Sequence, residues 1–394
     1  MRRALVPLFS MLLVQIACSA GNLSLASMMP AVAPDVGIGA TLIGAFTALS
    51  YGLAATTSLA AADPVARFGT VRICQLCLVA TAGGLAVMTL ATPWALILGV
   101  AFVGLAQGPV NTASSAVLAR RTPTQWYSTV FTIKQTGVPL GFALAGLAMP
   151  ALVLSVGWQG AALVGAGVLV GVAVLLQPLH GELESDSPPP ARVAFWQPMR
   201  DLLAHRQLRA IGFAALLYVT AQHSFTFVIV TYLVQRAGLT LVEAGAILAA
   251  SQIVGSVVRL AIGGLADMLR DRLSMLGIVG LVMGSGVVAV AFIDPTWPRW
   301  GIYAATLLYG ASASCWNGVA MGETARWSAP GQAGAMTSAS TCLTYVGGVV
   351  GPASVSALVG FTGDWRLAFG FVLVAVLSGA VWLLVEGAAL RRQA

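Results

Sequence analysis

The chain has 394 residues, of which 58 % are hydrophobic and only 8 % are charged. A soluble domain carries about 25 % charged residues, because charged side chains cover much of a surface that faces water. This composition excludes a soluble enzyme, a disulfide-rich secreted scaffold and a disordered chain, and a mean hydropathy of +0.89 is typical of a polytopic helical membrane protein. The net charge of +7 comes from arginines in short loops between apolar runs, so it does not indicate a nucleic-acid partner.

The apolar runs predict an all-α membrane protein with twelve transmembrane helices. The first run follows Arg2 and Arg3 as in a signal peptide, but it continues to Pro30, so we expect an uncleaved first span. In chain order the predicted spans cover residues 5–30, 39–62, 72–91, 95–118, 128–152, 159–177, 208–234, 241–263, 273–293, 300–322, 334–359 and 367–386.

One long connection, residues 178–207, divides the predicted spans into two groups of six. It contains Glu182, Glu184 and Asp186 and a run of three prolines, which is the composition of a solvated linker. We therefore expect an N-terminal six-helix bundle (1–177), a cytoplasmic linker (178–207) and a C-terminal six-helix bundle (208–394). The end of the linker, from Phe195 to Arg209, predicts an interfacial helix.

The arginines of the loops are distributed unequally between the two sides of the predicted membrane. The positive-inside rule places the arginine-rich side, with both termini and the linker, in the cytoplasm. This predicts a multi-pass protein of the cytoplasmic (inner) membrane. The arginine-rich side holds Arg2, Arg3, Arg67, Arg72, Arg120, Arg121, Arg192, Arg200, Arg206, Arg209, Arg270, Arg272, Arg326, Arg391 and Arg392, and the other side holds Arg236, Arg299 and Arg366.

The two groups of spans repeat each other. Two parallel six-span repeats joined by a long cytoplasmic linker are a layout of secondary transporters. The repeat is visible in Gly104, Asn111 and Arg120, which match Gly310, Asn317 and Arg326 at an offset of 206, and in Gly141 and Trp158, which match Gly348 and Trp365 at an offset of 207.

The segment from Gly263 to Asp267, followed by Arg270 and Arg272, has the G-x-L-x-D pattern of a gating loop. A degraded copy follows the second predicted span, with Ala62 and Ala66 in place of the expected Gly and Asp. With the repeat and the linker, these motifs make the chain resemble a major facilitator superfamily transporter over essentially its whole length. The resemblance implies transport by alternating access and a gating role for Gly263, Asp267, Arg270 and Arg272. Gly347-x-x-x-Gly351-Pro352 is similar to the Gly-Pro bend of this family.

All 13 acidic residues lie in predicted loops or at predicted span ends, so no carboxylate is expected at the midplane. Carriers of cations commonly hold the cation with a buried acid, and many proton-coupled carriers use one for the proton. Two basic residues, in contrast, lie within predicted spans: Lys134 and Arg259. An ionisable group there costs at least ~2.5 kcal/mol on insertion scales, so each needs an explanation.

Lys134, the only lysine of the chain, predicts attraction of an anionic substrate; the alternative is a side chain that snorkels to the cytoplasmic interface. Arg259 shares a helical face with Gln252 and Gly255, and its planar fork matches a carboxylate. A basic residue here is similar to monocarboxylate and oxalate–formate carriers. The chain departs from them at Gly255, where the former have an acid, and near Tyr345, where the latter have a lysine. The alternative is that Arg259 braces the cytoplasmic gate near Asp267.

Several polar and aromatic residues complete the candidate substrate site, because spans one, four, seven and ten line the cavity in the family that the chain resembles. Each of them can equally hold helices together by hydrogen bonds. His223 can relay a proton, or it can pack as a neutral hydrogen-bonding group between helices. The candidate substrate-binding residues are Lys134, Arg259, Asn22, Tyr51, Gln107, Asn111, His223, Gln252, Trp316, Asn317 and Tyr345.

The sequence therefore predicts a secondary transporter of a small organic anion, with a coupling proton or an exchanged anion as its second ligand. We expect no enzyme activity, cofactor, metal or nucleic-acid partner, since no phosphate loop, catalytic triad or metal-ligand cluster is found, and no need for an oligomer. Its expected partners are the small-molecule substrate and the lipid bilayer. The alternatives are an efflux carrier for neutral or amphipathic compounds and a non-transporting membrane receptor on the same scaffold.

Overall fold

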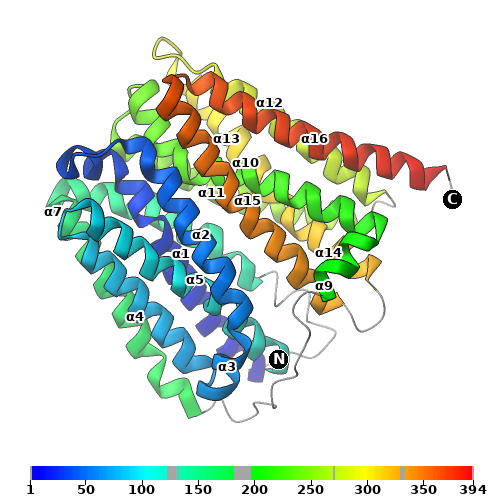
Figure 1. The fold of residues 1–394 in the computed structure, drawn as a ribbon, viewed down its shortest axis with the longest axis horizontal. Coiled ribbons are helices and arrows are strands. Elements are labelled where there is room, and N and C mark those ends of the chain that lie inside the picture. The colour runs from blue at the N-terminus through cyan, green and yellow to red at the C-terminus, as the bar shows by residue number, and fades with distance from the viewer. Residues whose placement is uncertain are drawn as a thin grey trace. The chain divides into compact units, whose positions relative to one another are not determined.

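The computed structural model describes residues 2–121, 130, 133–181, 197–268, 271–328 and 333–392, and every regular element within them is a helix (Figure 1). The chain forms two compact units. Unit 1 consists of Met1–Ala40 and Leu49–Val193, and unit 2 of Thr41–Ala48 and Ala194–Ala394. The division at residue 193 falls inside the predicted connection 178–207, and the short segment Thr41–Ala48 groups with unit 2.

The helices of the first half pack closely because small residues lie where they meet. A Cβ on Gly84 of α4 would lie 2.5 Å from the Gly99 carbonyl oxygen of α5, so these two backbones are in contact. The elements are α1 (Arg2–Val36), η1 (Ala40–Leu42), α2 (Ile43–Ala60), α3 (Ala62–Phe68), α4 (Thr70–Met88), α5 (Pro93–Arg121), α7 (Gly137–Leu175) and η3 (Gln177–Leu179).

Helix α7 covers most of predicted spans five and six, and a single residue joins its two arms. Gly157 has φ 72° and ψ 168°, a conformation that only glycine adopts readily, and it lies inside the predicted turn between spans five and six. A Cβ on Gly165 would lie 3.0 Å from the terminal methyl of Met149, so residues eight positions either side of Gly157 meet. The chain therefore reverses direction at Gly157, and both arms of α7 pack in unit 1.

The second half is organised around α10, which packs against α15 and α16, while α12 packs on α13 and lies beside α16 (Figure 1). The Gly-Pro motif brings α15 close to α10, since a Cβ on Gly347 or Gly351 would collide with the backbone carbonyls of Leu216 and Thr220. The elements are α9 (Gln197–Ala204), α10 (Arg206–Arg236), α11 (Leu241–Met268), α12 (Arg272–Ala291), α13 (Arg299–Cys315), α14 (Asn317–Trp327), α15 (Ala333–Thr362) and α16 (Trp365–Arg391).

The predicted tenth span is interrupted. Its residues form α13 and α14, and Trp316 between them belongs to neither helix. Within the described residues, 10 helical segments are long and apolar enough to cross a membrane. One of them, Ile133–Leu179, contains both arms of α7, and the interrupted tenth span is not among the 10, so the twelve predicted spans are all accounted for.

Two short helices flank the spans. The degraded motif copy, expected as a loop, forms α3. The predicted interfacial helix is α9, which buries Leu202 against Met336 and Ala339 of α15.

Candidate functional site

Lys134 lies in unit 1, in a helical segment just before α7, and its side chain is buried. Only 1 % of the residue is exposed, and its Nζ donates a hydrogen bond of 2.5 Å to the Oδ1 of Asn111 on α5. This burial favours the interior cation over the snorkelling alternative, because a snorkelling side chain keeps its charged end in water. The segment and α5 together hold an ammonium group on an amide oxygen.

A second polar cluster of unit 1 joins α1 and α2. Asn22 accepts a hydrogen bond from Ser50 at 3.2 Å and donates one to the Tyr51 hydroxyl at 3.5 Å. The structure thus brings the predicted residues Asn22 and Tyr51 together and adds Ser50. Gln107, one helical turn before Asn111 on α5, is half-buried.

Arg259 lies in unit 2 on α11, and its guanidinium binds a backbone carbonyl. Its Nε and Nη2 donate to the Ser314 carbonyl oxygen of α13 at 2.9 and 2.7 Å. Gly255, one turn earlier on α11, permits this contact, because a Cβ there would lie 2.8 Å from the Ser314 Cβ. An acidic side chain at residue 255 would therefore collide with α13, and Arg259 binds a neutral oxygen instead.

The remaining predicted residues of unit 2 form a hydrogen-bonded cluster beside the helix interruption. Asn317 donates to the Oε1 of Gln222 at 3.1 Å, and Gln252 donates to the Thr226 hydroxyl at 3.5 Å. Gln222 and Thr226 are one turn apart on α10, so they connect the two contacts. The His223 ring packs edge-to-face against Phe227, with 5.7 Å between the ring centroids.

Two aromatic candidates are buried in the packing of unit 2. Trp316 is 1 % exposed, its indole N–H donates to the Ala313 carbonyl at 2.9 Å, and its ring packs edge-on against Tyr218. An indole has one donor and no acceptor, so this bond uses the whole polar capacity of Trp316. Tyr345 on α15 is 9 % exposed. A substrate contact of either residue stays a prediction.

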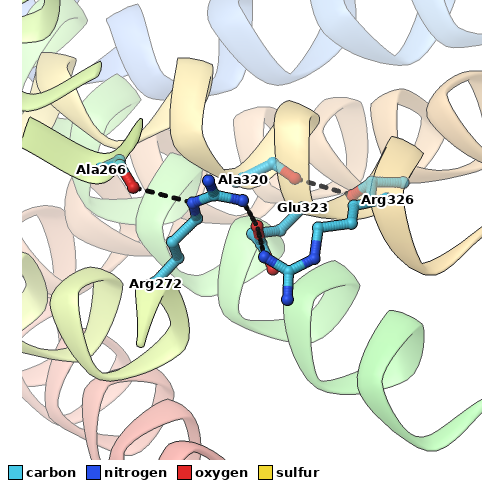
Figure 2. A network of polar contacts seen from close by, with 6 residues as sticks. Ala266, Arg272, Ala320, Glu323 and Arg326 are labelled. Atoms are coloured by element: carbon cyan, nitrogen blue, oxygen red, sulfur yellow. Dashed lines mark hydrogen bonds and ion pairs between the residues drawn. The ribbon is translucent and has the colours of Figure 1, made fainter. Parts of the chain in front are cut away.

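The predicted gate residue Arg272 takes part in an ion network at one end of unit 2 (Figure 2). Its Nε donates to the Ala266 carbonyl at 2.8 Å, and its Nη1 lies 3.1 Å from the Oε1 of Glu323 on α14. Arg326 approaches the same carboxylate oxygen at 3.5 Å. The network therefore joins the beginning of α12 to the end of α11 and to α14.

The other predicted gate residues are less defined. Asp267 and Gly263 lie in the last turns of α11, but the Asp267 side chain and all of Arg270 fall outside the described part of the chain. The residue that caps α12 is Asp271, whose side chain accepts a hydrogen bond of 3.0 Å from the Ser274 N–H. The gating role of Asp267 stays a prediction.

Glu323 is the functional candidate that the sequence interpretation did not single out. It lies directly after the predicted span 300–322, at a span end as expected for an acid, but it is only 3 % exposed. The available signal was Arg326 three residues later, which places both side chains on one face of a helix. The partner Arg272 is far away in the sequence, so its proximity depends on the packing of α12 against α14.

Comparison with known proteins identifies the family. A model described as Major Facilitator Superfamily matches residues 11–324. No curated protein sequence gives a significant match. Among solved structures, a bacterial homologue of the human lysosomal transporter Spinster, inward-facing and occupied, has a TM-score of 0.75 at 15 % identity, over 99 % of this chain and 96 % of that one.

Two further solved transporters share the fold. A POT family transporter in complex with 5-aminolevulinic acid has a TM-score of 0.80 at 13 % identity, over 97 % of this chain and 96 % of that one. The human organic anion transporter MFSD10 (TETRAN) has a TM-score of 0.66 at 17 % identity, over 97 % of this chain and 99 % of that one. Because the family model matches most of the chain and these transporters share its helical architecture, the protein belongs to the Major Facilitator Superfamily.

Proposed function

We propose that the protein carries a small organic anion across the cytoplasmic membrane by alternating access. The observation that carries this proposal is the neutral partner of Arg259. Among the described residues Arg259 forms no ion pair, and its guanidinium binds the Ser314 backbone carbonyl within a candidate span. A permanent cation on a neutral oxygen leaves a net positive charge that an anionic ligand can neutralise.

The position of Lys134 in unit 1 supports the same charge preference. It is a second buried basic side chain, held on an amide oxygen rather than exposed to water. Each unit of the protein thus contributes one cation from a span. Guanidinium and ammonium groups both form charge-assisted hydrogen bonds to carboxylates, which are roughly twice as strong as neutral ones. Small carboxylates are therefore the substrate class that we propose.

The remaining parts of the proposal follow from the family and the arginine distribution. The family supports alternating access, and the positive-inside rule supports cytoplasmic termini in the inner membrane. We propose a coupling proton or an exchanged anion as the second transported ligand. The structural relatives include an organic anion transporter and a transporter bound to 5-aminolevulinic acid, so this fold accommodates small charged organic molecules.

The test compares carboxylate binding in variants of the two cations. Lys134→Ala and Arg259→Ala should each weaken binding at least tenfold, about 1.4 kcal/mol, because the ligand loses a charged partner. Arg259→Lys should also weaken it, because an ammonium cannot form the two parallel bonds of a guanidinium. Binding is measured by thermal shift of the purified protein with lactate, succinate and benzoate.

The control is Arg200→Ala, which removes an exposed arginine of α9 and should leave binding unchanged. Neutral amphipathic compounds are titrated in parallel. If the two span variants lose carboxylates and neutral compounds equally, the residues serve folding or gating. If only neutral compounds bind the wild-type protein, the efflux carrier becomes the better description.

A further inference from the structure

The interruption between α13 and α14 leaves backbone carbonyls that a continuous helix would pair internally. In an α-helix the carbonyl of residue i accepts from the N–H of residue i+4. Here the Ala313 carbonyl accepts a hydrogen bond from the Trp316 indole, and the Ser314 carbonyl accepts one from Arg259. The regular pattern resumes where the Ala320 N–H donates to the Trp316 carbonyl. Side chains therefore replace the ladder across Trp316.

Arg259 is the strongest of these replacements. Its Nε and Nη2 both bind the Ser314 oxygen, at 2.9 and 2.7 Å, in the place that the Gly318 N–H would occupy in a continuous helix. Side chains inserted into the hydrogen-bond ladder are a recognised cause of sharp helix kinks. The Arg259–Ser314 contact therefore occupies the acceptor that would continue the ladder past Trp316.

In the first half of the chain, α2 and α5 are the repeat counterparts of α11 and the tenth span, and they lack the arginine. There α2 meets α5 at Gly108, where a Cβ would lie 2.5 Å from the Ser58 nitrogen. Gly108 matches Ser314 at the repeat offset of 206, and Ser58 matches Arg259 at the offset of 201 that relates the two gating motifs. Helix α5 runs from Pro93 to Arg121 without interruption. The repeat position with arginine has the broken helix, and the one with serine has the continuous helix.

We infer that Arg259 acts as a positioning residue whose contact with the Ser314 carbonyl holds the tenth span broken, and that an anionic ligand releases this contact by binding the guanidinium. The inference rests on the proposed function for the nature of the ligand. A carboxylate offers two charged oxygens to the same guanidinium fork, so it is the better acceptor. The freed Ser314 carbonyl then accepts from the Gly318 N–H, and α13 and α14 join into one helix.

Joining α13 and α14 would transmit the effect of ligand binding to the ion network of Arg272, Glu323 and Arg326. Helix α14 is 11 residues long and holds Glu323, which contacts Arg272 and Arg326. A change in the direction or rotation of α14 moves the Glu323 carboxylate relative to Arg272 on α12. The Arg259–Ser314 contact thus couples the substrate site to the predicted gate within unit 2.

The first test needs no ligand. Gly318 is exposed, and hydrogen exchange of the peptide covering residues 314–320 reports whether its N–H is bonded. Arg259→Met keeps an unbranched apolar stem and removes the guanidinium, so the ladder should close and exchange at Gly318 should slow at least tenfold relative to wild type. Unchanged exchange in a folded Arg259→Met protein would overturn the inference.

The second test keeps Arg259 in place and forbids the joined helix. Proline lacks the N–H that the Ser314 carbonyl requires, yet it is tolerated in the first turn of a helix, where Gly318 lies in the broken form. Gly318→Ala is the matched control, because no atom lies within 4 Å of a Cβ at this position. Gly318→Pro should bind the best carboxylate of the lactate, succinate and benzoate panel about tenfold more weakly than Gly318→Ala.

The outcomes separate this inference from the proposed function. Equal carboxylate binding by Gly318→Pro and Gly318→Ala would overturn the release of the contact while leaving the organic-anion carrier intact. Absence of carboxylate binding to wild type would overturn the proposed function and, with it, release by an anion. The exchange of Arg259→Met still decides, independently, whether Arg259 breaks the helix.

Discussion

Gly255 lies at a close approach of α11 to α13, and this proximity determines what Arg259 can reach. The Cβ of any larger residue at this position would lie 2.8 Å from the Ser314 Cβ, which is inside van der Waals contact. The two hydrogen bonds from Arg259 to the Ser314 oxygen depend on the same short separation of α11 and α13. The absence of a side chain at Gly255 thus allows Arg259, one helical turn away, to reach Ser314.

The change Gly255→Ala should destabilise the protein by about 1–3 kcal/mol, because overpacking forces α11 and α13 apart. It should also lengthen the Arg259–Ser314 contact. Gly370→Ala on α16 is the matched control, since no atom lies within 4 Å of a Cβ there. The stability of both variants is measured by thermal unfolding in detergent. Equal midpoints would show that a methyl group fits between α11 and α13 without overpacking.

At the scale of helices, the charged residues at one end of unit 2 join elements in pairs. The pair Arg272–Glu323 connects α12 to α14, and the pair Arg206–Glu386, 2.9 Å apart, connects α10 to α16. Both carboxylates are largely buried, with 4 and 9 % of their side chains exposed. In the first half the repeat position of Glu323 is Val117, so the same helix end lacks the central acid of this network.

The change Glu323→Gln should destabilise unit 2 by about 1–3 kcal/mol and alter transport rates, because Arg272 and Arg326 lose a shared charged partner. The matched control is Glu243→Gln, which neutralises a more exposed carboxylate paired with Arg299 at the opposite ends of α11 and α13. Exposed pairs contribute little, so the control should shift the unfolding midpoint far less. Similar shifts in the two variants would contradict a special role for Glu323.

At the scale of the whole molecule, apolar run length predicted the spans and the connection that contains Gly157, and the repeat, the linker and the gating motif carried the resemblance to the family. These features are local in the sequence. The scarcity of charge also identified Lys134 and Arg259. Their partners Asn111 and Ser314, and the interruption at Trp316, depend on which helix faces meet. Hydropathy does not encode that information, so only the packed structure revealed them.

The predicted topology can be checked by cysteine accessibility in intact cells. Gly181→Cys lies at an exposed position in the linker (178–207) and should react only with permeant reagents, because both termini and the linker are expected inside. Thr362→Cys, at the exposed end of α15, should react with impermeant reagents added outside. Four of the five native cysteines are buried and one is partly buried, which keeps the background low. Labelling of Gly181→Cys by impermeant reagents added outside would contradict the predicted topology.

The single-residue turn at Gly157 has a consequence for how the protein enters the membrane during synthesis. Its two arms share no loop, and Trp158 directly after the turn donates to the Asp35 carboxylate of α1 at 2.7 Å. A connection of one residue holds the two arms side by side at this end, where each covers apolar surface of the other. We therefore expect the two arms to enter the bilayer as one helical hairpin.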